Sequence, residues 1–203
     1  MSSTSFKQRV LNTITDCAPR FKAVFMDYEY LIYSEKFTMQ PYYIISTIAG
    51  NYKHLTGVNS TVSPHDFFEM CLNRTLTADD FDFSKEGQDE KFVRGVVRSK
   101  IIALPSMFDL FTNDLNAKEN FTQGTVNCSL ATTDNAITIG FEQRINASPK
   151  TLLKGNELRE ENIVNVTLVL RRAKGADKFD TVLQGDTLSF RELHKGVHIV
   201  NSK

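Results

Sequence analysis

The stretch Asn51–Gly57, Asn-Tyr-Lys-His-Leu-Thr-Gly, contains the residue types that are best suited to proton transfer. His54 lies one residue after Lys53 and two residues before Thr56. An imidazole titrates near neutrality, so it can accept and deliver a proton at cellular pH, and a neighbouring cation favours its neutral, basic form. We therefore consider His54 a candidate acid or base, with Lys53 and Thr56 as candidate substrate contacts. The alternative is that His54 only closes a turn before Gly57.

Lys100 is a second candidate because it interrupts an apolar helical pattern that runs over residues 88–113. At about 100° per residue, Lys100 falls inside the apolar stripe, whereas ordinary surface lysines fall outside such stripes. A lysine at this place either extends its stem until the ammonium reaches water, or puts its charge where a cleft needs it. The stripe consists of Val93, Val97, Ile101, Leu104, Phe108 and Phe111.

The segment Asn146–Lys154 carries a pattern typical of a helix start. Ser148 is a good cap, a proline follows it, and Lys150 and Lys154 add positive charge. Free backbone N–H groups and a positive dipole end would suit a phosphate, so Ser148 and Lys154 become candidate substrate contacts and Lys150 a candidate catalytic residue. The alternative is an ordinary re-entry of a loop into regular structure.

A basic cluster, which begins at Arg171, continues a predicted strand. Arg171 and the basic residues after it could contact a nucleic-acid backbone. They could equally form a solvated strand edge whose charge prevents aggregation. The cluster consists of Arg171, Arg172, Lys174 and Lys178.

These candidates suit one reaction, and the sequence lacks the signatures of several others. Cleavage of RNA without a metal needs a base for the 2′-hydroxyl, an acid for the leaving oxygen, and cations around the phosphorane, parts that His54, Lys100 and Lys150 could fill. The zinc-protease, phosphate-loop and dinucleotide-binding signatures are missing. His194 and His198 are four residues apart, but Gly196 between them disfavours a shared helical face. We therefore predict no metal and no cofactor.

Composition limits the environment of the protein. Its 203 residues include 24 Lys and Arg against 24 Asp and Glu, so bulk charge attracts neither nucleic acid nor an anionic membrane. There is no apolar run that could span a bilayer and no secretion signal, so we expect a cytoplasmic protein without a membrane partner. The three cysteines, Cys17, Cys71 and Cys128, lack close spacing and are interpreted as reduced, small apolar residues.

The N-terminal half of the chain is expected to begin with an amphipathic helix over residues 5–17 that stops before Pro19. Aromatic and β-branched residues over 21–33 predict a pair of strands, and residues 42–49 predict another strand, with a helix as the alternative. The cap Ser63 and the proline after it predict a helix up to Leu72.

The C-terminal half begins with the long helical pattern, which Pro105 should kink or divide. Alternating apolar residues then predict a hairpin of Val126–Leu130 with Ile137–Phe141, followed by strands over 164–170 and 179–183. Helices first and antiparallel strands later indicate an α+β fold with an antiparallel sheet of about four strands. We expect one domain over residues 1–203, with an N-terminal helix and strand elaboration.

Several short motifs together resemble a known family, the fourth class of phage-associated barnase, EndoU, colicin and RelE-like nucleases. The similarity covers most of residues 28–180 and includes a lysine-containing long helix. The motifs are His54-Leu55-Thr56-Gly57, Phe67-Phe68-x-x-Cys71-Leu72-x-x-x-Leu76, Asp79-Asp80-Phe81, Ile139-Gly140-Phe141 and Ser148-Pro149-Lys150-x-Leu152-Leu153.

This resemblance implies a ribonuclease-like fold that cleaves RNA without a metal, in a toxin or effector associated with phages or mobile elements. The motif carries over only His54, while Lys100 and Lys150 depend on their positions. The implied partners are RNA, with tRNA among the candidates, and an immunity protein or host protein. The alternative hypothesis is an inactive binding protein that sequesters a nucleotide, an RNA or a host protein in the same cleft.

Overall fold

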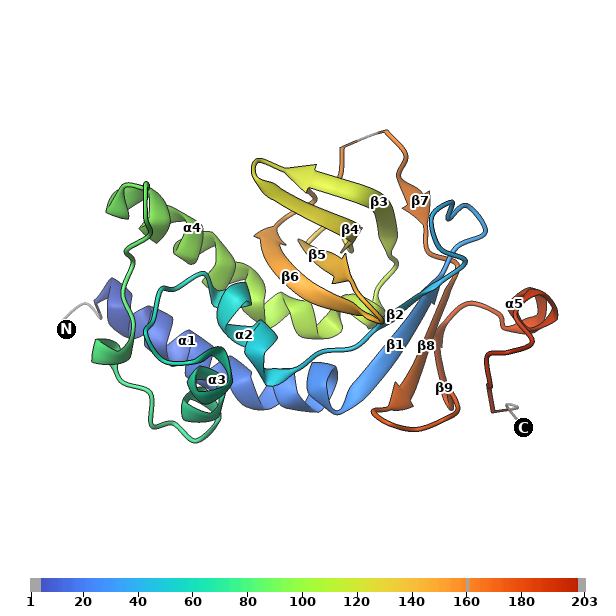
Figure 1. The fold of residues 1–203 in the computed structure, drawn as a ribbon, viewed down its shortest axis with the longest axis horizontal. Coiled ribbons are helices and arrows are strands. Elements are labelled where there is room, and N and C mark those ends of the chain that lie inside the picture. The colour runs from blue at the N-terminus through green and yellow to red at the C-terminus, as the bar shows by residue number, and fades with distance from the viewer. Residues whose placement is uncertain (1–4, 160, 201–203) are drawn as a thin grey trace.

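A computed structural model describes residues 5–159 and 161–200. Four helices gather toward one end of the molecule, a curled sheet occupies the middle, and a short helix lies at the far end (Figure 1). The helices are α1 (Phe6–Phe21), α2 (Ala49–Thr56), α3 (Pro64–Leu72), α4 (Glu90–Ala103) and α5 (Leu188–Leu193). A π-helical segment, Lys22–Met26, follows α1, and 3-10 helices cover Ala78–Asp80 and Leu104–Thr112.

The sheet contains nine strands among the described residues, in the order β7-β3-β4-β5-β6-β2-β1-β8-β9. Its neighbouring strands are antiparallel except for β2 and β6, which are parallel and share the single register pair Ile45 and Ala147. The α+β class is therefore confirmed, whereas the prediction of about four antiparallel strands is wrong. The strands are β1 (Tyr28–Tyr33), β2 (Tyr43–Ile45), β3 (Asn116–Gln123), β4 (Val126–Thr133), β5 (Ile137–Gln143), β6 (Ala147–Lys154), β7 (Val164–Asn165), β8 (Leu168–Ala173) and β9 (Thr181–Gln184).

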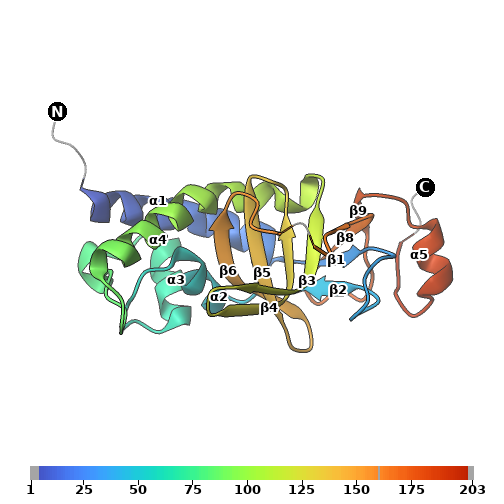
Figure 2. The same ribbon diagram turned by 90° about the horizontal axis from the view of Figure 1, so that it is seen from above.

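The main hydrophobic core joins the helices to one face of the β3–β6 meander. Figure 2 shows α1 and α4 running side by side along the sheet. Leu130, Phe141 and Leu152 of the meander belong to the same buried cluster as Val97 of α4 and Phe21 of α1. The opposite face of the meander buries a smaller cluster of Phe121, Cys128, Ala131 and Leu158. Cys17, Cys71 and Cys128 are all buried and free, as predicted.

The start of the chain differs from the prediction. Helix α1 does not stop before Pro19 but continues through it to Phe21, and the π-helical segment extends it to Met26. Ala18, Phe21 and Phe25 are all almost fully buried, so tertiary packing outweighs the cost of the missing proline N–H. The predicted pair of strands over 21–33 is therefore one strand, β1.

Strand β6 replaces the helical turn predicted at Ser148. It pairs antiparallel with β5, and a register shift at Gly140/Phe141 leaves Lys150 as an extra residue next to Pro149. Such a bulge accommodates a proline, which has no N–H for the ladder. The phosphate-binding helix start that we predicted at Ser148, Lys150 and Lys154 is thus wrong as local structure.

Strand β3 was missed because it is mostly polar, and one of its polar residues anchors a distant loop. The Glu119 carboxylate accepts hydrogen bonds from the backbone N–H groups of Thr38 (2.8 Å), Met39 (3.1 Å) and Gln40 (3.3 Å), and from the Tyr43 hydroxyl (2.6 Å). Burial raises the pKa of Glu119, but these hydrogen bonds together hold it below its ordinary value. Glu119 therefore fixes the loop between β1 and β2 against β3.

Other local predictions are confirmed. Ser63 caps α3, where its hydroxyl accepts a hydrogen bond from the Asp66 N–H (3.2 Å). The long helical pattern divides at Pro105 into α4 and a 3-10 helix. Strands β4 and β5 form the predicted hairpin. The strand predicted over 164–170 is split into β7 and β8, and the one predicted over 179–183 is the shorter β9.

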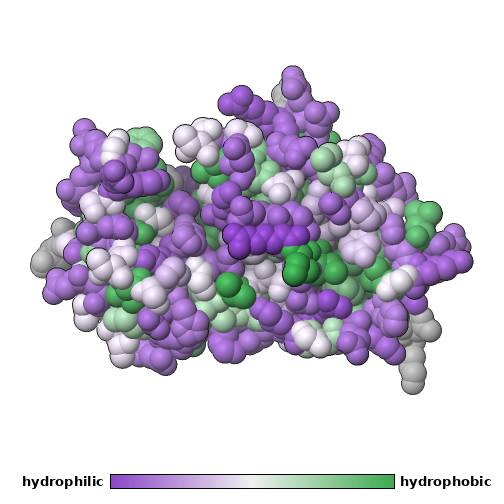
Figure 3. Space-filling view, viewed as in Figure 1, coloured by the Kyte–Doolittle hydropathy of each residue, from purple (hydrophilic) through white to green (hydrophobic). Residues whose placement is uncertain are grey.

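The surface is mostly hydrophilic. On the face drawn in Figure 3, hydrophobic residues are exposed only in small, separate groups. Within residues 5–159 and 161–200, no helix has the length and apolar character required to span a bilayer.

Candidate functional site

His54 lies in a helix rather than in the predicted turn. Helix α2 begins at Ala49 and buries Tyr52 and Leu55, so His54 occupies an exposed position in its last turn. The helix ends where Gly57 adopts a left-handed conformation with φ of 76°, a common helix C-cap for which glycine is favoured. The turn before Gly57 is therefore the last turn of α2.

Lys100 is buried against the end of this helix, as its place in the apolar stripe predicted. Its side chain is 9% exposed, and its ammonium Nζ donates a hydrogen bond to the backbone carbonyl oxygen of His54 at 3.2 Å. The last carbonyl groups of a helix have no partner within the helix, and they form the negative end of its dipole. A cation at this position is therefore stabilised by α2 itself.

Gly57 allows Lys100 to come this close. A Cβ atom added at Gly57 would lie 2.5 Å from Cδ and 3.2 Å from Cε of Lys100. Any other residue would thus meet the lysine stem as well as the cost of a positive φ. Gly57 serves both the end of α2 and the placement of Lys100.

The pKa values of Lys100 and His54 are both lowered, and the charge of Lys100 contributes to the shift of His54. Burial, followed by the charge of Lys85, lowers the pKa of Lys100 from 10.5 to about 8. Desolvation by its neighbours, followed by the charges of Lys53 and Lys100, lowers the pKa of His54 below its ordinary 6.5, although its ring reaches the surface. At neutral pH His54 is therefore a neutral base beside a cationic Lys100.

Lys53 and Thr56 have partners inside the protein. The Lys53 ammonium donates to the carbonyl oxygens of Ser60 (2.5 Å) and Val62 (2.7 Å). The Thr56 hydroxyl donates to the Lys53 carbonyl oxygen (2.7 Å). The Lys53 bonds hold the loop after α2 against the helix, and the Thr56 bond lies within the last turn of α2.

Strand β6 runs beside α2, but its predicted site residues face different surroundings. The Asn51 side-chain N–H donates to the Pro149 carbonyl oxygen (3.0 Å), which ties α2 to β6. The Lys150 ammonium lies 3.4 Å from the Glu142 carboxylate. Ser148 is half-buried and Lys154 is exposed at the end of the strand. The structure therefore brings Lys100 to His54, whereas it pairs Lys150 with Glu142.

Arg171 belongs to β8, two positions along the sheet from β2. Its guanidinium carbon lies 4.5 Å from the centroid of the Tyr28 ring, a cation–π contact. The following Arg172 forms a largely buried ion pair with Glu29 at 2.8 Å. These two members of the predicted basic cluster therefore pack on the sheet.

Sequence reasoning missed two residues of the site. Asn51 caps the start of α2, where its side-chain oxygen accepts from the Ile48 N–H (2.9 Å), and it also contacts β6. An asparagine in the first helical turn could have signalled a cap if α2 had been recognised as a helix. Lys85, whose charge acts on Lys100, comes from a loop and carried no signal in the sequence.

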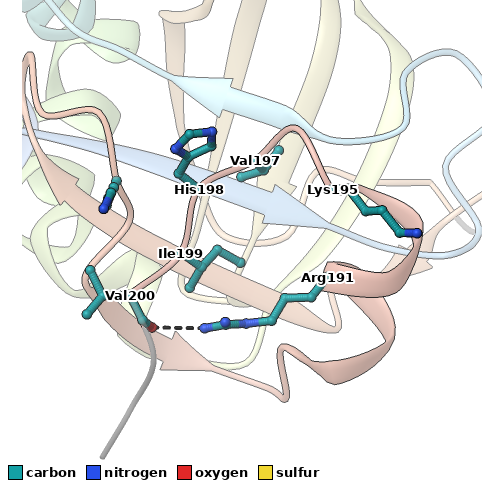
Figure 4. Close-up of a pocket in the computed structure, with 7 residues that line it drawn as sticks. Arg191, Lys195, Val197, His198, Ile199 and Val200 are labelled. Carbon is teal, nitrogen blue, oxygen red and sulfur yellow. Dashed lines mark hydrogen bonds between the residues drawn. The ribbon is translucent and has the colours of Figure 1, made fainter.

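A basic pocket of about 540 Å³ lies under α5. Figure 4 shows Arg191, Lys195 and His198 around it. His198 comes from the chain after α5, whereas His194 ends the helix and packs on Phe190 with ring centroids 4.6 Å apart. Within the described part of the chain, no group of three His, Cys, Asp or Glu could hold a metal ion. The pocket lies at the opposite end of the molecule from α2 in Figures 1 and 2, so it is separate from the His54 site.

The architecture is therefore that of an α+β protein in which a helix-borne histidine and a buried lysine meet beside a β-meander. A family profile described as phage-Barnase-EndoU-ColicinE5/D-RelE like nuclease4 matches residues 13–192. The chain belongs to this family, as the sequence motifs predicted. Comparison with curated proteins and with solved structures gave no match.

Proposed function

We propose that the protein is a metal-independent endoribonuclease, acting in the cytoplasm as a toxin or effector of a phage or mobile element. Membership of the nuclease family supports the reaction class. The observation that carries the proposal is the buried Lys100 ammonium, held 3.2 Å from the His54 carbonyl oxygen at the end of α2. A buried cation beside a surface histidine keeps the imidazole neutral and ready to accept a proton.

In the proposed reaction, His54 accepts the proton of a ribose 2′-hydroxyl while the 2′-oxygen attacks the adjacent phosphorus. The bond to the 5′-oxygen breaks, and that oxygen takes a proton from a second group. The products are a 2′,3′-cyclic phosphate and a 5′-hydroxyl. Lys100 acts through its charge on His54 and on the developing phosphorane. Lys150 of β6 is proposed as the second proton donor, which requires its ion pair with Glu142 to open.

The first experiment incubates purified protein with total tRNA and with a defined transcript, in the presence of EDTA, and maps the new ends. We expect ends that carry 5′-hydroxyl and 2′,3′-cyclic phosphate groups, and their loss in His54→Ala. His65→Ala is the matched control, because His65 is an exposed histidine in the first turn of α3. Cleavage by His54→Ala at the wild-type rate would contradict the assignment of His54.

A pH profile tests the role of His54 as a base. Since the pKa of His54 is lowered from its ordinary 6.5, the imidazole is mostly neutral at pH 6.5 and above, and the rate should fall only at lower pH. A rate that increases as the imidazole becomes protonated would reverse the direction of proton transfer at His54.

The alternative function is an inactive binding protein that sequesters a nucleotide, an RNA or a host protein. It is favoured by one observation: the two pockets on α4 and α5 are lined by basic residues, and His54 lines neither. RNA binding without new ends in the EDTA assay, equal for the wild type and His54→Ala, would support this alternative.

A further inference from the structure

Three arginine side chains, one from α1 and two from α4, converge on one aromatic ring in the first turn of α1. The guanidinium carbons of Arg9, Arg94 and Arg98 lie 6.0, 5.2 and 5.3 Å from the centroid of the Phe6 ring. Because cation–π contact keeps each guanidinium carbon within about 6 Å of the Phe6 ring centroid, any two of these carbons are at most about 12 Å apart. Phe6 itself is 9% exposed and packs on Phe83, so the ring is a fixed platform.

Few acidic groups neutralise this cluster. Arg94 forms an exposed ion pair with Glu90 at 3.4 Å. Among residues 5–159 and 161–200, Arg9 and Arg98 make no ion pair within 4 Å and no side-chain hydrogen bond. Because the whole chain has no net charge, such a concentration of positive charge is local. A polyanion is the ligand that would neutralise it.

Two of the three arginines, Arg94 and Arg98, line a hollow on α4. The hollow measures about 680 Å³ and is lined by Glu90, Lys91, Arg94, Gly95 and Arg98. The last three lie three, four and seven residues after Lys91, which places the four residues on one helical face. A Cβ atom added at Gly95 would meet nothing within 4 Å, so packing does not require glycine there. Glycine weakens a helix interior, and at this place it keeps the hollow open between two arginines.

We propose that this groove, lined by Lys91, Arg94, Gly95 and Arg98 of α4 and extended by Arg9 of α1 at the Phe6 ring, binds the phosphodiester backbone of an RNA strand. The inference rests on the proposed function for the identity of the polyanion. Arginine suits this ligand because its planar group presents several donors to phosphate oxygens. Lys91 and Arg98 are separated by about 10 Å along the helix, room for neighbouring phosphates of one strand. Arg9 precedes the region that the family profile matches, so this surface includes a residue outside that region.

The test places a carboxylate in the groove without removing an arginine. In a His54→Ala background, which holds the RNA uncut, Gly95→Glu is compared with Gly95→Gln by fluorescence anisotropy on a labelled 12-nucleotide RNA. Both side chains fit the open space and both strengthen the helix relative to glycine, so a loss of folding cannot explain a difference. We expect Gly95→Glu to weaken binding about tenfold and Gly95→Gln to change it less than twofold. Equal binding by the two variants would overturn the proposal.

A second pair of variants measures the number of phosphate contacts. The slope of log K against log salt concentration, where K is the association constant for RNA, is negative. Replacing Arg9 and Arg98 together by Gln should reduce its magnitude by about 1.4 for a single strand. The control replaces Lys178 and Lys195 by Gln, which removes the same charge from the pocket under α5. Weaker RNA binding by the Lys178 and Lys195 control alone would refute the RNA groove. So would a polyglutamate peptide of the same charge that competes for the groove as well as RNA does.

Cleavage assays separate this inference from the proposed function. If the wild type cuts RNA and the groove variants raise KM without changing kcat, both proposals stand. If the wild type cuts RNA and the groove variants leave KM unchanged, only the groove is refuted. If no RNA is cut but Gly95→Glu still weakens binding, the groove stands and the nuclease proposal fails.

Discussion

Replacing Lys100 by methionine should make the protein more stable while it removes the proposed activity. The folded protein lowers the pKa of Lys100 from 10.5 to about 8. Each pKa unit corresponds to about 1.4 kcal/mol, so holding the charged lysine costs the folded state about 3 kcal/mol at neutral pH. Methionine fills a similar volume without charge, but it loses the bond to the His54 carbonyl oxygen, worth about 1 kcal/mol. We therefore expect Lys100→Met to gain about 2 kcal/mol at pH 7.

The pH dependence of this gain identifies its cause. Below pH 8 the lysine is protonated in both the folded and the unfolded protein, so the full cost applies. Between about pH 8 and pH 10.5 the folded protein releases the proton and the unfolded chain keeps it, so wild-type stability rises relative to the variant. The advantage of Lys100→Met should thus shrink by about 2 kcal/mol between pH 7 and pH 9.5.

Urea unfolding at the two pH values measures the difference, and Lys91→Met supplies the control, since Lys91 is an exposed lysine on the same helix. At pH 7 the variant should also melt about 4–8 °C higher than the wild type, whereas the control should differ little. A destabilised Lys100→Met, or an advantage that does not change with pH, would refute the reasoning that the charge is held at a cost.

Two further substitutions test the local geometry. Gly57→Ala should destabilise the protein by about 3 kcal/mol and lower the cleavage rate, because the methyl group would meet Lys100 and the φ of 76° is strained. Gly87→Ala is the control, since Gly87 has a φ of 71° but open space around it, and it should cost about 1 kcal/mol when both variants are unfolded in urea. Equal costs for the two variants would exclude the contact with Lys100 as the cause. Glu119→Gln should cost about 2 kcal/mol at pH 7, because an amide cannot accept from all the donors of the Thr38–Gln40 loop. Since the pKa of the Glu119 carboxyl is lowered in the folded state, its stabilisation is present above the ordinary pKa of 4.5 and is lost as the pH falls. The difference in unfolding free energy between wild type and Glu119→Gln should therefore narrow toward pH 3. A difference that stays constant with pH would contradict this account.

Local patterns predicted those parts of the structure that local interactions determine. The helical period alone placed Lys100 on a buried face, and the structure confirms its burial. Capping chemistry located the start of α3 at Ser63, and Pro105 located the division of the long helix. The motifs around His54 identified the family. None of these depends on where distant segments meet.

The remaining parts depend on tertiary contacts. Ser148 and Pro149 look like a helix start in the sequence, but pairing with β5 makes them part of a strand. Helix α1 passes through Pro19 because the residues around the proline are buried. The contact of Lys100 with His54 joins residues 46 positions apart, and the spacing of neither residue encodes it. A prediction from sequence could therefore name the candidates but not their arrangement.

The single register pair between β2 and β6 gives the sheet a narrow seam. On one side lie β1, β2, β8 and β9, and on the other β3 to β7. The contact between β2 and β6 consists of the Ile45–Ala147 pair and the bond from the Ser46 N–H to the Ala147 carbonyl oxygen, while Glu119 joins the halves at a second place. Sheets normally open where the fewest ladder bonds must break, so the two halves should exchange amide hydrogens as separate cooperative units. Helix α2 begins directly after this seam and is tied to β6 through Asn51. Opening of the seam would therefore move the imidazole together with the meander and relative to β1, β2, β8 and β9.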